Sequence, residues 1–201
     1  PFSPNPTATP NQTTTYTVQI TNAVTDFCTI QKEVMVYVPP RINLEADPNV
    51  TTCDAQTEIC ATSDVSVDFG WFNDSGAFLG GTDCITVDVS GASNYMVTAR
   101  DQYNCTEQDV MVVIGGPVEA TVSDDEILCT NDAFNVTHTN LDPNDILNLN
   151  WTPSNLFSGN PQDDPTPTIN PIPGEQTIYV EATNQFGCSK SDSINLTIVD
   201  E

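Results

Sequence analysis

Hydrophobic and polar residues alternate along three stretches of the chain, and each stretch has a cysteine at its centre. The clearest is the range 177–199, TIYVEATNQFGCSKSDSINLTIV, where every second residue is apolar on both sides of a turn-like segment. Period-two alternation around a turn that contains glycine is typical of a half-buried antiparallel hairpin. The alternating apolar residues are Ile178, Val180, Ala182, Ile194, Leu196 and Ile198.

The same pattern occurs near residue 100 and again near the N-terminus. The middle copy has Tyr95, Val97 and Ala99 before Cys105, and Val110, Val112 and Ile114 after it. The first copy has Tyr16, Val18 and Ile20 before Cys28, and Val34, Val36 and Val38 after it. The copies are roughly 80 residues apart, which is a period long enough for one small domain per repeat. The chain is therefore expected to consist of tandem β domains.

Short segments rich in proline and glycine separate the copies. They are Val38-Pro39-Pro40 and Gly115-Gly116-Pro117. Proline after a strand cannot continue the hydrogen-bond ladder, and such short linkers are stiff. We expect the C-terminal part of one repeat at 1–38 and whole repeats at 41–115 and 118–201, arranged as a rod of touching domains.

The first part holds a hairpin and little else. A lone hairpin is not stable in water, so its apolar face needs a cover. We expect the cover to come from neighbouring repeats of the same longer chain or from another copy, as in a homo-oligomer or filament.

The two whole repeats align with each other. Cys53 and Cys129 each precede a strand, and two alternating segments end on Trp71 and on Trp151. A tryptophan that ends such a strand reads as a core residue of a β-sandwich. No segment has a 3.6-residue apolar period, so the fold class is all-β: tandem Ig-like β-sandwich domains stabilised by disulfides.

This combination resembles the Ig-like and PKD-like repeats of large secreted surface proteins of Bacteroidota, often adhesins exported by the type IX system. The residues that carry the resemblance in the last repeat are Cys129, Trp151, Thr177, Val180, Ala182, Gly187, Cys188 and the strand 194–198. In the repeat before it they are Cys53, Trp71, Phe72, Tyr95, Val97, Ala99 and Cys105. The resemblance implies a cell-surface or secreted repeat protein used for adhesion, gliding or filament building.

The seven cysteines contain no C-x-x-C pair, which argues against a zinc ribbon and favours disulfides in an oxidising compartment. Comparison of the two whole repeats predicts the bonds Cys53–Cys105, Cys129–Cys188 and Cys60–Cys84. In a standard sandwich, however, the first two pairs lie at opposite poles. The alternative is a Cys53–Cys188 bond that staples one repeat to the next.

The chain is strongly acidic, with 28 acidic against 4 basic residues and a net charge of −24. Without a cationic footprint, nucleic acid and anionic membranes are not expected as partners. No apolar run is long enough to span a membrane. No cofactor is required, and solvated surface is the first expectation for the acidic clusters, with calcium as the alternative. The calcium candidates are Asp124, Asp125, Glu126, Asp163 and Asp164.

Catalytic residues are not evident. The single histidine, His138, follows Phe134 and Val136 at alternating positions, which indicates a packed or rim position. We therefore expect a non-enzymatic extracellular stalk, fibre or adhesin rod whose surface ligand the sequence does not name. Accessory domains of a large secreted hydrolase are one alternative. Another is a carbohydrate- or protein-binding module that uses aromatic residues near turns: Phe72, Phe78, Tyr103, Phe157 and Phe186.

Overall fold

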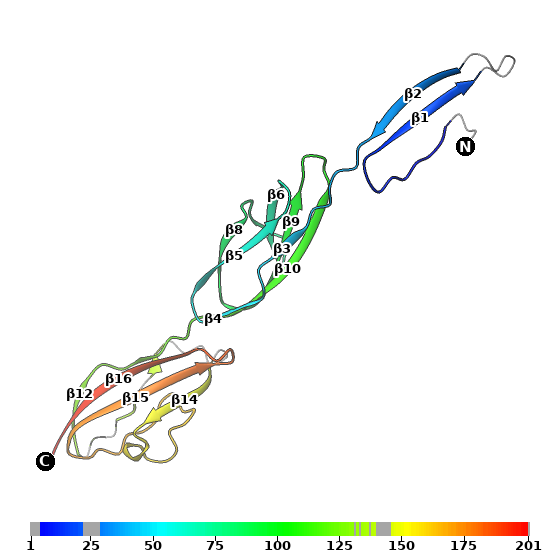
Figure 1. Ribbon diagram of the computed structural model, residues 1–201. Coiled ribbons are helices and arrows are strands. Elements are labelled where there is room, and N and C mark those ends of the chain that lie inside the picture. Colours follow the sequence, from blue (N-terminus) through cyan, green and yellow to red (C-terminus); the bar gives the residue numbers. More distant parts are fainter. Residues whose placement is uncertain are drawn as a thin grey trace.

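The computed structural model describes residues 5–21, 29–130, 132, 134–136, 138–139 and 146–200. The described residues form strands and one short 3-10 helix, η1 (Ser154–Leu156). Figure 1 shows three bodies that follow one another along a line from the N-terminus to the C-terminus. We call them the N-terminal hairpin, the central sandwich and the C-terminal sandwich. The fold is all-β, as the alternation predicts.

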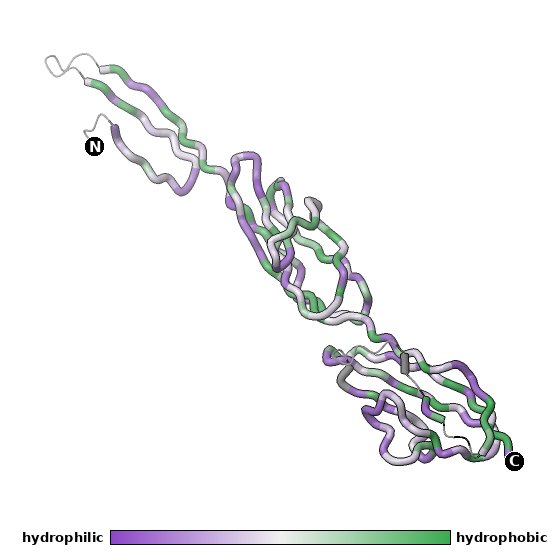
Figure 2. The backbone as a smooth tube through the Cα atoms, turned by 180° about the vertical axis from the view of Figure 1, so that it is seen from behind, coloured by the Kyte–Doolittle hydropathy of each residue, from purple (hydrophilic) through white to green (hydrophobic). Residues whose placement is uncertain are grey.

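The N-terminal hairpin consists of β1 (Thr14–Thr21) and β2 (Thr29–Val36). The two strands pair antiparallel from Thr14 opposite Val36 to Thr21 opposite Thr29, and they form a two-stranded sheet. At its base, Thr13 Oγ1 accepts the backbone N–H of Val38 at 3.1 Å. Apolar positions run along both arms (Figure 2), and no second sheet of the described residues pairs with or covers the two strands.

The central sandwich has two sheets. One contains β3 (Leu44–Ala46), β5 (Gln56–Ser63) and β8 (Cys84–Asp88), in that order. The other contains, in order, β4 (Val50–Thr52), β10 (Thr106–Gly115), β9 (Gly91–Arg100), β6 (Asp68–Asn73) and β7 (Phe78–Gly80). The first strand is divided between the sheets, because β3 pairs antiparallel with β5 whereas β4 pairs parallel with β10. This strand order is that of an Ig-like sandwich.

Two packing features of the central sandwich match the Ig fold. Tyr95 is buried, and its hydroxyl donates a hydrogen bond to the carbonyl oxygen of Asp88 at 3.4 Å. A tyrosine that reaches back to the chain a few residues upstream, two positions before the second core cysteine of antibody domains, is the tyrosine corner. Here Val97 occupies that cysteine position, and it is fully buried with Trp71 and Ile59. A buried apolar residue of the core thus stands where antibody domains have a cysteine of the disulfide between the sheets.

The C-terminal sandwich repeats the arrangement. Its larger sheet has the order β12 (Glu126–Cys129), β16 (Ser189–Val199), β15 (Gly174–Asn184) and β14 (Ile146–Thr152). Opposite it lie β11 (Thr121–Val122) and β13 (His138–Thr139), together with an isolated bridge between Phe157 and Ile169. As in the central sandwich, the divided first strand ends parallel to the last one, here β12 beside β16.

One expected strand face is wrong. Val110, Val112 and Ile114 were expected to alternate toward the core, but Val110 is 64% exposed, whereas Met111 and Val113 are each 1% exposed. Tyr95 pairs with Met111 in the β9–β10 ladder, and this register sets the inward face. Both sets of alternate residues are apolar in the segment VMVVI, so alternation cannot distinguish the two faces, and a one-residue shift exchanges them.

Candidate functional site: the covalent junction between the sandwiches

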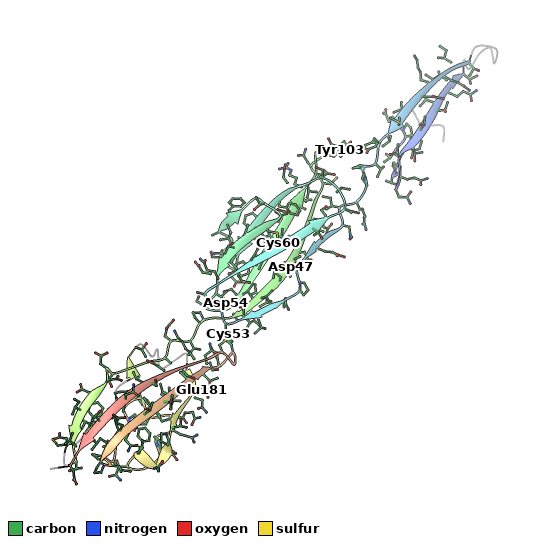
Figure 3. The ribbon with its side chains drawn as sticks, turned by 60° about the vertical axis from the view of Figure 1, so that its left-hand side comes forward. Asp47, Cys53, Asp54, Cys60, Tyr103 and Glu181 are labelled. Carbon is green, nitrogen blue, oxygen red and sulfur yellow. A yellow bond between two sulfur atoms is a disulfide. The ribbon has the colours of Figure 1, made fainter. Side chains whose placement is uncertain are left out.

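The central and C-terminal sandwiches are joined by a disulfide bond in addition to the chain. Cys53, just after β4, bonds to Cys188, at the end of the turn between β15 and β16, with a Cα–Cα distance of 5.5 Å. Figure 3 shows Cys53 at the end of the central sandwich that faces the C-terminal sandwich. The two residues are 135 positions apart in the sequence. The bond therefore ties together surfaces of two different repeats.

Hydrogen bonds accompany the disulfide. The backbone N–H of Gly116 donates to the carbonyl oxygen of Thr52 at 3.1 Å. The side-chain amide of Asn184 donates to the carbonyl oxygen of Gly116 at 3.3 Å. Asn184 and Cys188 are both buried, so these contacts are largely withdrawn from water. Linker, central sandwich and C-terminal sandwich thus meet in one small polar cluster.

Two glycines allow this close approach. Gly115 has φ +137° and Gly116 has φ +135°, backbone conformations that residues with a Cβ rarely adopt. A Cβ on residue 115 would also overlap the carbonyl oxygen of Thr52. The Gly-Gly pair that marks the linker in the sequence is therefore a geometric requirement of the junction.

The turn that presents Cys188 is held by Asn184. Its Oδ1 accepts the backbone N–H groups of Phe186 and of Cys188, each at 3.0 Å. Its own N–H donates to the carbonyl oxygen of Cys188 at 3.0 Å. Gly187 supplies the positive φ, +82°, that closes the turn. These contacts fix the direction of the Cys188 side chain toward Cys53.

The turn between β9 and β10 has the same construction. Asp101 Oδ1 accepts the backbone N–H groups of Tyr103 and of Cys105, each at 2.8 Å. The N–H of Asp101 donates to the carbonyl oxygen of Cys105 at 3.0 Å. Asn104 takes the positive φ, at +66°. The segments DQYNC and NQFGC are one structural motif, and its signal in the sequence is the equal spacing of Asp101 or Asn184 to the cysteine four residues later.

The expected pairs Cys53–Cys105 and Cys129–Cys188 are wrong. Cys53 follows Thr52, which pairs with Gly115 at the end of β10, whereas Cys105 precedes the start of β10. Ten residues of strand separate these ends by about 33 Å, so no bond can form within the sandwich. The alternative, a bond from one repeat to the next, is the one present.

The third expected bond, Cys60–Cys84, is present. The two cysteines stand opposite each other on the neighbouring strands β5 and β8, with a Cα–Cα distance of 4.1 Å. In the part of the chain that the structure describes, Cys105 is exposed and unbonded, and Cys129 is half-buried and unbonded. Cys28 lies outside the described residues.

The two tryptophans occupy equivalent core positions. Trp71 pairs with Val97 across β6 and β9, and Trp151 pairs with Val180 across β14 and β15. Both indoles are buried. The indole N–H of Trp71 donates to the carbonyl oxygen of Thr82 at 3.0 Å, and that of Trp151 donates to the carbonyl oxygen of Asp164 at 2.9 Å.

The calcium candidates do not converge on one point. Asp125 Oδ1 accepts the backbone N–H of Asn195 at 2.7 Å, and Asp163 Oδ1 accepts that of Leu149 at 3.1 Å. Asp164 Oδ1 accepts the N–H of Thr166 at 2.9 Å, and Asp124 and Glu126 are exposed. Among the described residues, only Glu58, Cys60 and Cys84 group their ligand atoms closely enough for a metal, and both sulfurs belong to a disulfide.

Several acidic side chains instead accept strand N–H groups at matching places in the two sandwiches. Asp109 accepts the N–H of Ala46, and Asp192 accepts the N–H of Val122, each at 2.9 Å. Both aspartates stand four residues after the cysteine of their turn. Each carboxylate ties the last strand of its sandwich to the divided first strand, a structural use of acidic residues that composition does not reveal.

The aromatic residues near turns divide into buried and exposed. Phe157 is buried, Phe72 and Phe186 are half-buried, and Phe78 is 64% and Tyr103 48% exposed. Phe78 lies against Phe72 with ring centroids 5.7 Å apart. Tyr103 lies against Tyr37, in the segment that leads from the hairpin, with ring centroids 5.3 Å apart and the ring planes tilted by 49°. The two tyrosines help to line an open hollow of about 430 Å³ beside Arg100 and Asp68.

His138 lies on β13, where it pairs with Val122 in the ladder.

Nothing in the described part of the chain is a helix long and apolar enough to cross a membrane.

Comparison with known proteins gives structural likenesses only. No protein-family model matches the chain, and no curated protein matches it. Among solved structures, the N-terminal four Ig domains of Dscam1 isoform 1.9 are 13% identical, with a TM-score of 0.43 over 92% of this chain and 54% of that one. The fibronectin(III)-like modules of Clostridium thermocellum CbhA are 13% identical, with a TM-score of 0.34 over 79% of this chain and 95% of that one. The Bacteroides ovatus mixed-linkage glucan utilization protein SGBP-B, in complex with a heptasaccharide, is 11% identical, with a TM-score of 0.34 over 79% of this chain and 48% of that one. The Ig-like assignment rests on strand order and the tyrosine corner.

Proposed function

We propose that this chain is a non-enzymatic, extracellular segment of a repeat protein whose role is mechanical: a stalk, fibre or adhesin rod on a cell surface. The observation that carries the proposal is the Cys53–Cys188 bond between successive sandwiches. Disulfides persist in oxidising, extracytoplasmic settings, which supports the location. The sequence resemblance supports a Bacteroidota surface protein exported by the type IX system.

A disulfide between repeats has a direct mechanical consequence. The linker at Gly115 and Gly116, expected from its shortness to be stiff, would by itself leave the sandwiches some freedom to pivot, because glycine has few conformational restrictions. The covalent bond and the Thr52–Gly116 and Asn184–Gly116 hydrogen bonds remove that freedom. The pair then bends less, and force along the rod is shared between the linker and the disulfide.

The N-terminal hairpin also supports the proposal that this chain belongs to a longer array of repeats. Its apolar side chains Ile20, Ile30 and Val34 are more than half exposed. Its β1–β2 ladder pairs Tyr16 with Val34, as β9–β10 pairs Tyr95 with Met111, whose side chains are core residues of the central sandwich. We infer that the further strands of a sandwich cover this face, supplied by another part of the longer chain or by another copy.

Small-angle X-ray scattering tests the mechanical role. The double variant Cys53→Ser/Cys188→Ser should show a broader distribution of overall dimensions than the native chain, because the junction becomes a hinge. The matched control Cys60→Ser/Cys84→Ser removes a bond inside one sandwich and should leave the distribution unchanged. Identical profiles for the native chain and the junction variant would contradict a role for the bond in rod stiffness.

Ligand binding is a second candidate function, favoured by the aromatic pairs Phe72–Phe78 and Tyr37–Tyr103, in which Phe78 and both tyrosines are exposed. Aromatic faces beside polar groups suit carbohydrate or peptide ligands. A glycan array probed with the native chain, and with Phe78→Ala and Tyr103→Ala, tests this function. Binding that is lost in one of the variants supports it, and the absence of binding to any glycan argues against carbohydrate recognition.

A further inference from the structure

The two unbonded cysteines occupy the same places in their sandwiches as the two bonded ones. Cys105 ends the turn between β9 and β10, as Cys188 ends the turn between β15 and β16. In each turn the residue four positions earlier, Asp101 or Asn184, accepts two backbone N–H groups, including that of the cysteine. Cys105 is therefore a cysteine of the Cys188 type. Its turn, between β9 and β10, lies at the end of the central sandwich that faces the hairpin (Figure 1).

Strand register makes the corresponding match for Cys129. Val113, eight residues after Cys105, pairs with Val50, and Leu196, eight residues after Cys188, pairs with Glu126. Three residues after Val50 stands Cys53, one residue beyond the end of its ladder, and three residues after Glu126 stands Cys129, opposite Val199. Cys129 is therefore a cysteine of the Cys53 type.

The bond between Cys53 and Cys188 shows that cysteines at these two positions form a disulfide when two repeats adjoin. In a single chain Cys105 and Cys129 cannot meet. Cys105 belongs to the turn between β9 and β10, Cys129 pairs with Val199 at the end of β16, and these two places lie at opposite ends of the joined sandwiches (Figure 1). We propose that Cys105 and Cys129 are the open halves of two further junctions of the same kind: Cys129 bonds to a turn cysteine of the repeat that follows, and Cys105 bonds to a Cys53-type cysteine of the repeat that precedes. This extends the proposed repeat rod into a continuous disulfide-linked array.

The chemistry is a two-electron oxidation. Two thiols lose two protons and two electrons and form one sulfur–sulfur bond. A disulfide oxidant, such as glutathione disulfide in vitro, accepts the electrons and protons and becomes two thiols. The exposure of Cys105 allows access to such an oxidant. Attack proceeds through a thiolate and a mixed disulfide, as in other exchange reactions.

An extended chain tests the proposal with the two open positions themselves. Residues 1–200 are followed directly by a second copy of residues 41–201. Residues 199 and 200 then stand directly before the appended central sandwich, as Pro39 and Pro40 do in the native chain. Serine replaces Cys28, the first Cys105 and the second Cys129, which leaves one open cysteine of each type. A second version carries V199P and D200P at the join, to reproduce Pro39 and Pro40, which precede the central sandwich in the native chain. Both versions are reduced and then equilibrated with glutathione and glutathione disulfide.

Peptide mapping without reduction should show the remaining Cys129 bonded to the remaining Cys105. As the disulfides re-form, free-thiol titration should fall to none instead of stopping at two per chain. The control with Cys129→Ser should retain one titratable thiol. Two free thiols in both versions, in samples where the Cys53–Cys188 bonds have re-formed, would overturn the proposal. A Cys129–Cys105 bond found only in covalent multimers would overturn the assignment to adjoining repeats. Because the map records bonds and not stiffness, its result is separate from that of the scattering experiment.

Discussion

Gly115 lies so close to the carbonyl group of Thr52 that a Cβ atom on residue 115 would overlap the carbonyl oxygen. The contact joins the last residue of β10 to the last residue of β4 and sits directly beside Cys53. The same close contact therefore sets the direction in which the chain leaves the central sandwich and the position of the disulfide to the next sandwich.

The variant Gly115→Ala is expected to lose stability and to disturb the junction. The backbone conformation alone should cost about 1–3 kcal/mol, and the overlap forces Thr52 to move. The control Gly76→Ala also has a positive φ, +77°, but nothing within 4 Å of the added Cβ, so it should lose only about 1 kcal/mol. Urea unfolding and the yield of the Cys53–Cys188 bond measure the effect, and equal losses in both variants would contradict it.

The tryptophans should be major sources of stability in each sandwich. Trp71→Ala or Trp151→Ala removes a buried indole and should destabilise its sandwich by about 3–5 kcal/mol. Phe at either position keeps much of the buried ring but leaves the carbonyl oxygen of Thr82 or Asp164 without its donor, so the loss should be smaller. Chemical unfolding followed by tyrosine fluorescence and circular dichroism measures both. A loss below about 1 kcal/mol for an alanine variant would be inconsistent with a core role.

The reactivity of Cys105 should depend on Asp101. Desolvation raises the pKa of the Cys105 thiol, and the charge and hydrogen bond of Asp101 raise it further. Asp101→Asn removes the charge but keeps the turn, since Asn184 makes the same contacts at the equivalent place. The pKa should fall, so alkylation by iodoacetamide at pH 8 should become faster, and the difference should vanish at pH values above both pKa values. Asp109→Asn, on the next strand, serves as the control and should leave the rate unchanged.

Asp74 should contribute to stability at neutral pH and lose that contribution in acid. The backbone N–H of Asn94, and then its side-chain amide, lower the pKa of Asp74 below its ordinary value of 3.8. A group whose pKa is depressed by folding stabilises the fold above its unfolded pKa, and the contribution is lost as the pH falls through its folded pKa. The melting temperature of Asp74→Ala should therefore lie below that of the native chain at pH 6 and approach it near pH 2. A gap of the same size at both pH values would contradict this prediction.

The repeated alternation around Cys28, Cys105 and Cys188 was sufficient to predict an all-β chain of repeated units. Period two encodes which residues face inward along a strand, and this information is local. Core positions of Trp71 and Trp151 followed for the same reason, since each ends an alternating segment. Where both sets of alternate residues are apolar, as in β10, the local pattern could not distinguish the two faces of the strand, and the inward face was assigned wrongly.

Comparison of the repeats predicted the Cys60–Cys84 bond, but the partner of Cys53 was decided by the arrangement in space. A disulfide needs Cα atoms within about 7 Å, and which strand ends meet depends on topology and on how successive sandwiches stack. Cys53 and Cys105 belong to one repeat but lie a full strand length apart, whereas Cys53 and Cys188, 135 residues apart, are brought together by the turn at Gly115 and Gly116. The number of residues between two cysteines does not give their distance in space. That distance depends on the linker conformation that places the end of one sandwich against the next, and this conformation exists only in the folded pair of sandwiches.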